Sequence, residues 1–147
     1  MTLQIQIVDP SEHMAQAREL IAANWAETGF DFPFAPNEQA YAHLAQAGLM
    51  FAVAAFKQEE IIGYCTVMVS PHMHNPEVIV AANDALFVAP EYRKGTVTAR
   101  IIRAAENEAA RRGAGRFLWH CRAGTNFAQV LTRHGYEPVD NVVMRTI

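Results

Sequence analysis

The chain has 147 residues, of which 51% are apolar and 18% charged, and its formal net charge at neutral pH is −3. This length fits one domain of about 100 to 150 residues with its own core, so we expect residues 1–147 to form a single domain. The composition excludes a disordered chain, and the negative net charge argues against a general nucleic-acid-binding protein.

The sequence carries no signal for a membrane or for export. No apolar run approaches the roughly 18 residues of a membrane-spanning helix, and the opening "MTLQIQIVDP" lacks the basic and apolar regions of a signal peptide. We therefore expect no membrane association and a cytoplasmic location. Cys65 and Cys121 stand apart, each in a strand-like stretch and neither in a CxxC pair, so both are expected to be buried thiols.

Positive charge is concentrated in one part of the chain. The segment from Arg93 to Arg122 carries a net charge of +6, and the remainder carries −9. One explanation is a solvated helix face, which Arg111 and Arg112 fit because cations suit a helix C-terminus. The other is a site for an anionic small molecule, and composition leaves both open.

The first elements in chain order are a strand and a helix. "LQIQIV" alternates apolar and polar residues, which predicts a half-buried strand. Asp9 as the capping carboxylate, Pro10 at the first helical position and Glu12 predict a helix start, and this helix should continue to about Ala26. The residues that it should bury are Met14, Ala17, Ile21 and Trp25.

A second helix and three strands should follow the aromatic loop "GFDFPFAP". "NEQAYAHLAQAG" predicts a short helix that Asn37 caps and Gly48 ends. "LMFAVAAFK" and "IIGYCTVMVS" predict an antiparallel hairpin around the polar turn 58–60. "PHMHNP" predicts a second turn, which leads into a third strand from about Val78 to Val88.

The remaining elements complete a mixed fold. A helix from about Thr98 to Arg112 should end at Gly113, "RFLWHC" predicts a strand, "TNFAQVLTRH" a short helix ended by Gly135, and the tail to Ile147 a strand. The longer helix should bury Ile101, Ile102, Ala105 and Ala109. The order β-α-α-β-β-β-α-β-α-β predicts an α/β (α+β) fold with a mixed, mostly antiparallel sheet and helices on both faces.

This order and two motifs together resemble the GNAT superfamily of N-acetyltransferases. The motifs are "FVAPEYR" and, near the end, "NFAQVLTRHGY", in which Asn126, Gly135 and Tyr136 match the family's closing pattern. The resemblance covers nearly the whole chain. It implies acetyl-CoA as the cosubstrate, no metal, and direct transfer of the acetyl group to a primary amine of a small molecule or peptide. It also allows a homodimer.

The family's phosphate-binding loop has the form Q/R-x-x-G-x-G/A, and this chain departs from it. Counting from Arg93, the two glycine positions fall on Thr96 and Thr98, and only Gly95 remains, one place early; glycine-poor loops of this kind resemble those of some phage-encoded members. A loop that opens a helix still offers unpaired N–H groups and the positive end of the helix dipole. The expected cofactor-binding residues are Val88, Arg93, Lys94, Gly95, Thr96, Val97, Thr98 and Asn126. An ordinary turn before a helix is the alternative.

The reaction that the resemblance implies needs a base, donors for an oxyanion and a proton for the leaving thiolate. The implied oxyanion donor is a backbone N–H near Val88. Asp84, nine residues before Arg93, is one candidate base; its strand parity with Val88 places both on one face unless a bulge intervenes. His120 is the rival, because histidine titrates near neutral pH. The alternative for Asp84 is a polar strand residue near a cleft edge, and the alternative for His120 is a satisfied histidine in the core or at the rim.

The general acid stays unassigned. The family often places a tyrosine four residues before the closing glycine, and this chain has Leu131 there. Tyr92, His134 and Tyr136 are near in sequence without a spacing that selects one of them, and a thiolate is a fair leaving group without an acid.

Two further clusters carry alternatives. His72 and His74 have alternate spacing, but no third ligand is evident, so we expect no metal site. Phe30, Phe32 and Phe34 form either a wall of the acceptor pocket, which the resemblance places beside this loop, or core packing.

We therefore predict an acetyl-CoA-dependent N-acetyltransferase whose acceptor amine the sequence does not identify. The alternative is a catalytically impaired CoA-binding or ligand-binding module with the same fold. A third interpretation is an interaction protein that uses the aromatic loop as its partner surface.

Overall fold

The structure, a computed structural model, describes residues 2–147. Its sheet has five strands in the spatial order β1-β2-β3-β4-β5. The first four pair antiparallel, and β5 lies parallel to β4. The fold class is therefore the mixed, mostly antiparallel one expected. The strands are β1 (Leu3–Val8), β2 (Met50–Lys57), β3 (Glu60–His72), β4 (Asn75–Val88) and β5 (Ala114–Leu118).

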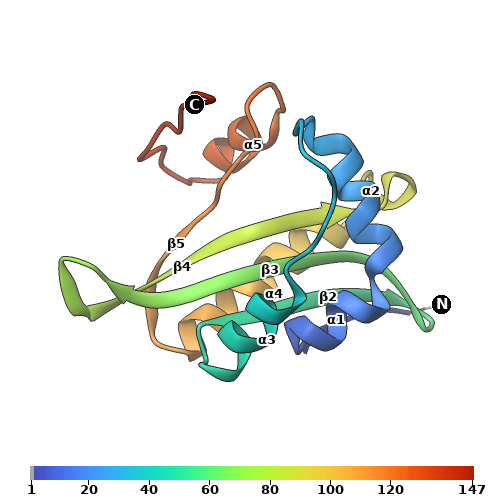
Figure 1. The fold of residues 1–147 in the computed structure, drawn as a ribbon, viewed down its shortest axis with the longest axis horizontal. Helices are drawn as coiled ribbons and strands as arrows, with labels where there is room; N and C mark the ends of the chain where they lie inside the picture. The colour runs from blue at the N-terminus through green and yellow to red at the C-terminus, as the bar shows by residue number, and fades with distance from the viewer. Residues whose placement is uncertain (1) are drawn as a thin grey trace.

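Helices cover both faces of the sheet (Figure 1). Helices α1 (Pro10–Gln16), α2 (Arg18–Thr28) and α3 (Glu38–Gln46) lie on one face of the sheet. Helix α4 (Val97–Arg111) crosses the other face, and α5 (Phe127–Arg133) lies beyond the end of β5, beside the C-terminal tail. No helix among residues 2–147 is both long enough and apolar enough to cross a membrane. A short 3-10 turn at Pro90–Tyr92 precedes α4.

The core lies between α4 and the sheet. Ile101, Ala105 and Ala109 recur every four residues, so they share one helix face, and they pack against β2, β3 and β4. Ile102, which was also expected to be buried, is half-buried at the border of this face. Gly63 on β3 permits the close approach, because a Cβ at this position would lie 3.0 Å from Ile101 Cδ1.

Helix capping follows the sequence signals. Asp9 accepts from the backbone N–H groups of Ser11 and Glu12 at the start of α1. Asn37 accepts from the backbone of Ala40 at 3.0 Å at the start of α3. Gly48, just after α3, has a φ of +72°, a left-handed conformation that glycine adopts at no steric cost.

The first long helix is two helices, contrary to the prediction. The helix breaks at Ala17, which has a φ of −104° and a ψ of 17° and is itself buried. The break lets α1 pack on β2 and α3 while α2 turns toward β3. Met14 and Ala17 are buried as expected, but Ile21 and Trp25 are only half-buried because they line a cavity.

The tail after α5 forms no strand within the described residues, so the last predicted strand is wrong. A valine-rich segment becomes a strand only where it pairs with a sheet edge. Here Tyr136 holds the start of the tail, because its hydroxyl donates to Glu106 Oε1 over 2.5 Å. The exposed apolar side chains of the tail are Val139, Val142, Val143, Met144 and Ile147.

The two cysteines differ in their surroundings. Cys65 is fully buried in β3 as expected, and burial raises the pKa of its thiol. Cys121 lies after the end of β5, outside any strand, and is half-buried, which corrects the prediction; burial raises the pKa of its thiol too. A raised pKa leaves little thiolate at neutral pH, so neither side chain is set up as a nucleophile.

Candidate active site

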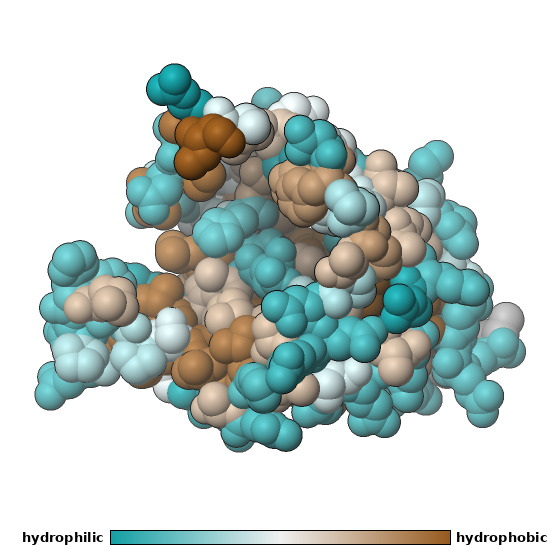
Figure 2. All heavy atoms as spheres, in the orientation of Figure 1, coloured by the Kyte–Doolittle hydropathy of each residue, from teal (hydrophilic) through white to brown (hydrophobic). Residues whose placement is uncertain are grey.

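A cavity opens where β4 and β5 separate. The two strands pair only as far as Ala82 and Leu118. Asn83, which is 6% exposed, spans the gap, since its Oδ1 accepts from the backbone N–H of His120 at 2.6 Å and its Nδ2 donates to the carbonyl of His120 at 3.3 Å. The cavity has a volume of about 940 Å³, and β4, α2, α3 and the segment after β5 supply its walls. Figure 2 shows the hollow on this face of the molecule.

Asp84 lies at a β-bulge in the wall of this cavity. On β3, Thr66 pairs with Ala85 while Val67 pairs with Asn83, so Asp84 is an extra residue without a partner. A bulge bends the strand and redirects the side chain at that position. Asp84 accordingly extends into the cavity.

The bulge also overturns the expectation that Asp84 and Val88 share a face. Ala81 and Val88 both lie in the core on the α4 face, although they are an odd number of residues apart, which a regular strand does not allow. The Asp84 carboxylate, by contrast, contacts α3 on the opposite face. Only the backbone of Val88 is therefore left to serve the cavity.

Two hydroxyl groups position the Asp84 carboxylate. Tyr41 donates to Oδ2 at 2.7 Å, and Thr66, which is buried, donates to the same atom at 3.0 Å. Oδ1 accepts no hydrogen bond from the described residues, so it remains free to face a ligand. Burial, with the nearby Asp84 carboxylate as the second cause, raises the pKa of Tyr41 above its ordinary range, so Tyr41 keeps its proton and stays a donor.

Tyr64 is a second tyrosine of the cavity that sequence reasoning missed. Its hydroxyl accepts from Asn24 Nδ2 at 2.9 Å, which leaves its own hydrogen available. Burial raises its pKa, so it too remains protonated. No motif marks Tyr41 or Tyr64; their strand and helix positions become informative only once the sheet and its covering helices are placed.

The residues weighed as a general acid lie elsewhere. Leu131 is buried, and Tyr136, whose pKa burial raises to about 12, donates to Glu106. The Tyr92 ring lies beneath the Lys57 ammonium group, and the Lys57 Nζ atom is 4.9 Å from the centre of this ring. Neither these residues nor His134 line the cavity.

His120 lines the cavity, as Asp84 does, but it does not end a strand as expected, because β5 stops at Leu118. Its side chain is exposed, and its backbone is fixed by Asn83. Both candidate bases thus border the same cavity, and of the two only Asp84 has side-chain partners that orient it among residues 2–147.

The loop from Arg93 to Thr98 needs no glycine. Gly95 does not have a positive φ, and a Cβ added to it would come no closer than 4.0 Å to its nearest neighbour, the carbonyl of Tyr92. Thr96 caps α4 without a side-chain hydrogen bond. The backbone N–H groups of the first turn therefore point out from a helix of 15 residues without a side-chain cap, which is an anion-binding arrangement.

The Arg93 side chain is held at the mouth of the cavity. Its Nη2 donates to both carboxylate oxygens of Glu27, at 2.9 and 3.0 Å, and its Nε donates to the carbonyl of Val88 at 2.7 Å. Arg122 donates to the carbonyl of Glu27 at 3.0 Å. The end of α2 is thus tied to the loop before α4 and to the segment after β5.

The expected cofactor residues lie in four different surroundings. Val88, Arg93 and Thr98 border the cavity, and Lys94, Gly95 and Thr96 form the exposed turn between them. Val97 is buried in the core. Asn126 caps α5 without a side-chain hydrogen bond and is exposed.

The basic segment has structural partners for several of its cations. Arg111 and Arg112 pair with Glu108 at 2.6 and 2.9 Å at the end of α4, which fits the first explanation of the local charge. These hydrogen bonds, that of Arg111 first, lower the pKa of Glu108 to about 2.

The aromatic loop forms one wall of the cavity. Trp25 lies 5.3, 5.0 and 5.9 Å from the ring centres of Phe30, Phe32 and Phe34, and all four residues border the cavity.

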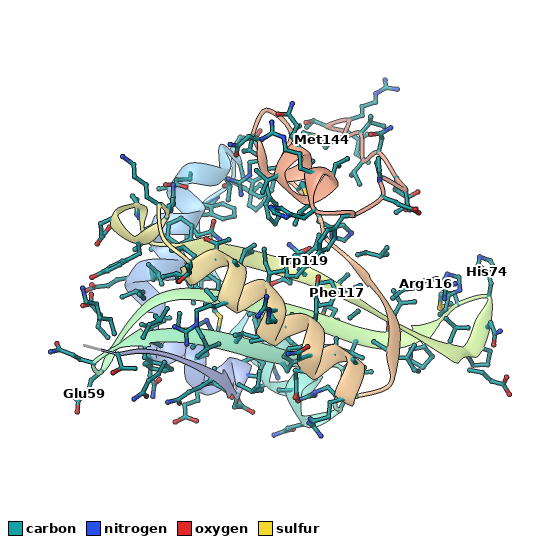
Figure 3. The ribbon with its side chains drawn as sticks, turned by 180° about the vertical axis from the view of Figure 1, so that it is seen from behind. Glu59, His74, Arg116, Phe117, Trp119 and Met144 are labelled. Carbon is teal, nitrogen blue, oxygen red and sulfur yellow. The ribbon has the colours of Figure 1, made fainter. Side chains whose placement is uncertain are left out.

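The histidine pair lies far from this site. His74 is at the tip of the β3–β4 hairpin, as Figure 3 shows, 5.6 Å from His72 between ring centres. No group of three or more metal-binding side chains is present among residues 2–147.

The segment after β5, which supplies His120 and Arg122 to the cavity wall, is anchored on α4. Phe117 and Trp119 stack at 4.3 Å beside α4 (Figure 3), and Trp119 Nε1 donates to Glu106 Oε1 at 2.9 Å. Glu106 therefore holds the segment after β5 and, through Tyr136, the segment after α5.

Known structures share this architecture. A ribosomal-protein-alanine N-acetyltransferase from Brucella melitensis biovar Abortus 2308 is 15% identical, with 99% of each chain covered and a TM-score of 0.73. AAC(6')-Iy in complex with the bisubstrate analogue CoA-S-monomethyl-acetylneamine is 18% identical, covers 100% of this chain and 99% of its own, and has a TM-score of 0.76. An aminoglycoside acetyltransferase, meta-AAC0020, from an uncultured soil metagenomic sample is 15% identical. The match covers 99% of this chain and 94% of that enzyme, with a TM-score of 0.74.

These identities are low, so the structures establish the fold alone. Among curated protein sequences, none matches the chain. The sequence model of the acetyltransferase (GNAT) family, however, matches residues 14–136, which include α2 to α5 and the whole cavity wall. The chain is therefore an acetyltransferase that belongs to the GNAT family.

Proposed function

We propose that the protein transfers the acetyl group of acetyl-CoA to a primary amine, with Asp84 as the general base. The observation that carries this proposal is the Asp84 carboxylate, which a bulge turns into the cavity and which Tyr41 and Thr66 hold through Oδ2 while Oδ1 stays free. A general base must lie within hydrogen-bond reach of the proton that it removes. Oδ1 meets this condition for an ammonium group that enters the cavity.

The groups that would bind acetyl-CoA are the backbone N–H groups of Lys94 to Thr98 and the side-chain cations of Arg93 and Lys94. The start of α4 offers N–H groups and the positive end of the helix dipole to a pyrophosphate. The turn needs no positive φ, so the threonines that replace the family's glycines are compatible with binding. When bound, acetyl-CoA supplies an acetyl group as a thioester.

In the proposed reaction, the Asp84 side chain in the cavity transfers the proton that the amine must lose. Asp84 takes a proton from the acceptor ammonium, and the free amine attacks the thioester carbonyl carbon. The N–C bond forms, the C–S bond breaks, and the second nitrogen proton is released as the thiolate takes one up. Backbone N–H groups near Val88 would stabilise the oxyanion. His120 is the alternative base.

The competing function is a CoA-binding module without catalysis, which the missing tyrosine at Leu131 favours. In this structure Leu131 is buried and packs away from the cavity. Two other tyrosines, Tyr41 and Tyr64, border the cavity, and this supports catalysis over the competing function.

We also propose that two copies associate through the tail. Its apolar side chains are exposed in a single chain, and β5 leaves one sheet edge open. Figure 2 shows apolar atoms gathered at the C-terminal end. Light scattering after size-exclusion chromatography is expected to give the mass of a dimer, and a monomer after removal of residues 138–147. A cytoplasmic location stays a prediction from the sequence.

The experiment that tests the proposed function incubates the protein with acetyl-CoA and a panel of primary amines. The assay measures the released CoA thiol and identifies the acetylated amine by mass spectrometry. Amine-dependent release that Asp84→Asn lowers is the expected result. Binding of acetyl-CoA without any transfer would support the module, and neither binding nor transfer would overturn both.

A further inference from the structure

The acceptor end of the cavity is unusually aromatic and is not packed shut. Phe30 and Phe32 stack at 5.2 Å with an interplanar angle of 26°, and each is 56% exposed. Side chains that only fill a core are covered, whereas these rings leave large apolar faces in contact with solvent. Trp25 and Phe34 extend the same surface. An apolar group that stacks on these rings would remove their faces from water.

Among the charged groups that border the cavity, Glu27 and Arg93 form an ion pair, whereas the Asp84 carboxylate and the Arg122 guanidinium group have no oppositely charged partner among the described residues. Two carboxylates, Glu27 and Asp84, and two guanidinium groups, Arg93 and Arg122, border the cavity. Glu27 is already bound to Arg93 through both carboxylate oxygens, and its carbonyl accepts from Arg122. Asp84 is therefore the one lining carboxylate without a cationic partner among the described residues. The cavity has one place for one ammonium group.

We propose that the acceptor is a primary monoamine carried on an aromatic or apolar body, with its ammonium group at Asp84 and its body on the rings of Trp25, Phe30, Phe32 and Phe34. A polyamine or aminoglycoside would bring further ammonium groups next to Arg93 and Arg122, where like charges repel. This inference rests on the proposed function and names its substrate class. A monoamine acceptor would also distinguish this chain from the aminoglycoside acetyltransferase that shares its fold.

The reaction with such an acceptor is balanced. The ammonium group loses one proton to Asp84 and a second as the N–C bond forms; the C–S bond breaks and the CoA thiolate takes up one proton. The products are the acetamide, CoA and one net proton.

The test compares 2-phenylethylamine with ethanolamine and with spermidine as acceptors, using the full chain and acetyl-CoA. Stacking of the phenyl ring on the aromatic wall is expected to raise kcat/KM for 2-phenylethylamine over ethanolamine by about 10- to 100-fold. Phe32→Ala is expected to reduce this ratio by about tenfold, mainly through KM. Met73→Ala, which removes an exposed apolar side chain at the far hairpin tip, serves as the matched control and should leave the ratio unchanged.

The relative rates of the three amines and of the Phe32→Ala variant test the proposed acceptor class. Faster turnover of spermidine than of 2-phenylethylamine would overturn the inference and leave the proposed function in place. If no amine is acetylated, the proposed function fails, and calorimetry with 2-phenylethylamine alone then decides the inference. Binding that Phe32→Ala weakens supports the monoamine pocket, and no binding overturns it. An unchanged selectivity ratio in Phe32→Ala would also overturn it.

Discussion

Tyr41 on α3 donates a hydrogen bond to Asp84 Oδ2 over 2.7 Å and so joins a covering helix to the bulge of β4. The two residues are 43 positions apart in sequence. The contact fixes the carboxylate with one oxygen engaged and the other directed at the cavity. The position of the proposed base is therefore a property of the tertiary fold and of the bulge together.

Asp84→Asn is expected to lower kcat by about 10²- to 10⁴-fold, since asparagine keeps the shape but cannot accept a proton. The rise of the rate with pH should flatten as well. Steady-state rates across a pH series measure both effects. Glu77→Gln at the exposed start of β4 is the control for loss of one charge. A pH profile that Asp84→Asn leaves unaltered would transfer the role of base to His120.

Gly95→Ala is expected to leave folding intact and to change acetyl-CoA affinity by no more than about twofold. The reason is that Gly95 has an ordinary φ and that a new Cβ would lie 4.0 Å from the nearest atom. Gly63→Ala is the contrasting variant, because its Cβ would lie 3.0 Å from Ile101 and overpacking of this kind costs about 1 to 3 kcal/mol. Denaturation curves and calorimetry compare them. A strong loss of affinity in Gly95→Ala would show that the loop changes conformation when it binds.

Glu27→Gln releases the Arg93 guanidinium from its bidentate partner and is expected to tighten acetyl-CoA binding up to about fivefold. The pair is partly exposed, so the effect should remain small. Glu38→Gln breaks the more exposed pair with Arg18, which is also 2.9 Å long, and should have no effect on affinity. Equal affinities for both variants would mean that the Arg93 side chain takes no part in binding.

His13 should make the fold less stable in mild acid. It is fully buried, neither ring nitrogen has a hydrogen-bond partner among the described residues, and burial lowers its pKa from 6.5 to about 4. Below pH 6.5 the unfolded chain binds a proton that the folded chain does not. The free energy of unfolding therefore falls as the pH drops from about 6.5 to about 4, by up to about 3 kcal/mol, and His13 contributes no pH dependence above this window.

Replacement of His13 by phenylalanine should remove this component. Urea denaturation at pH 5 and pH 7.5 measures the difference, and His74→Phe at the exposed hairpin tip is the control. If wild type and His13→Phe lose stability equally on acidification, the buried imidazole is not the cause.

Much of the fold follows from local sequence signals. The helix caps at Asp9 and Asn37 predict the starts of α1 and α3. The four-residue spacing of Ile101, Ala105 and Ala109 predicts α4, and the polar turn after Lys57 predicts the β2–β3 hairpin. Where prediction fails, tertiary contacts decide. The break at Ala17 depends on what α1 and α2 each pack against. The valine-rich tail pairs with no strand of the sheet among the described residues, although the edge of β5 is open.

The site was less predictable than the fold, for a physical reason. Asp84 and His120, the two bases that the sequence predicts, both border the cavity. The bulge reversed the expected face of Asp84 relative to Val88, because one extra residue shifts the two-residue period of a strand. Tyr41, Tyr64 and Asn83 reach the cavity from elements whose approach no local pattern specifies.

The most direct test of the account is a calorimetric titration of the purified protein with acetyl-CoA, after mass spectrometry has shown that no ligand copurified. We predict micromolar binding that Thr96→Asp weakens by at least about tenfold, because a carboxylate at the start of α4 repels the pyrophosphate. Gln58→Asp, the same charge change in the β2–β3 turn, should leave affinity unchanged. An absence of binding, or equal affinity in wild type and Thr96→Asp, would contradict the assignment of this loop as the cofactor site.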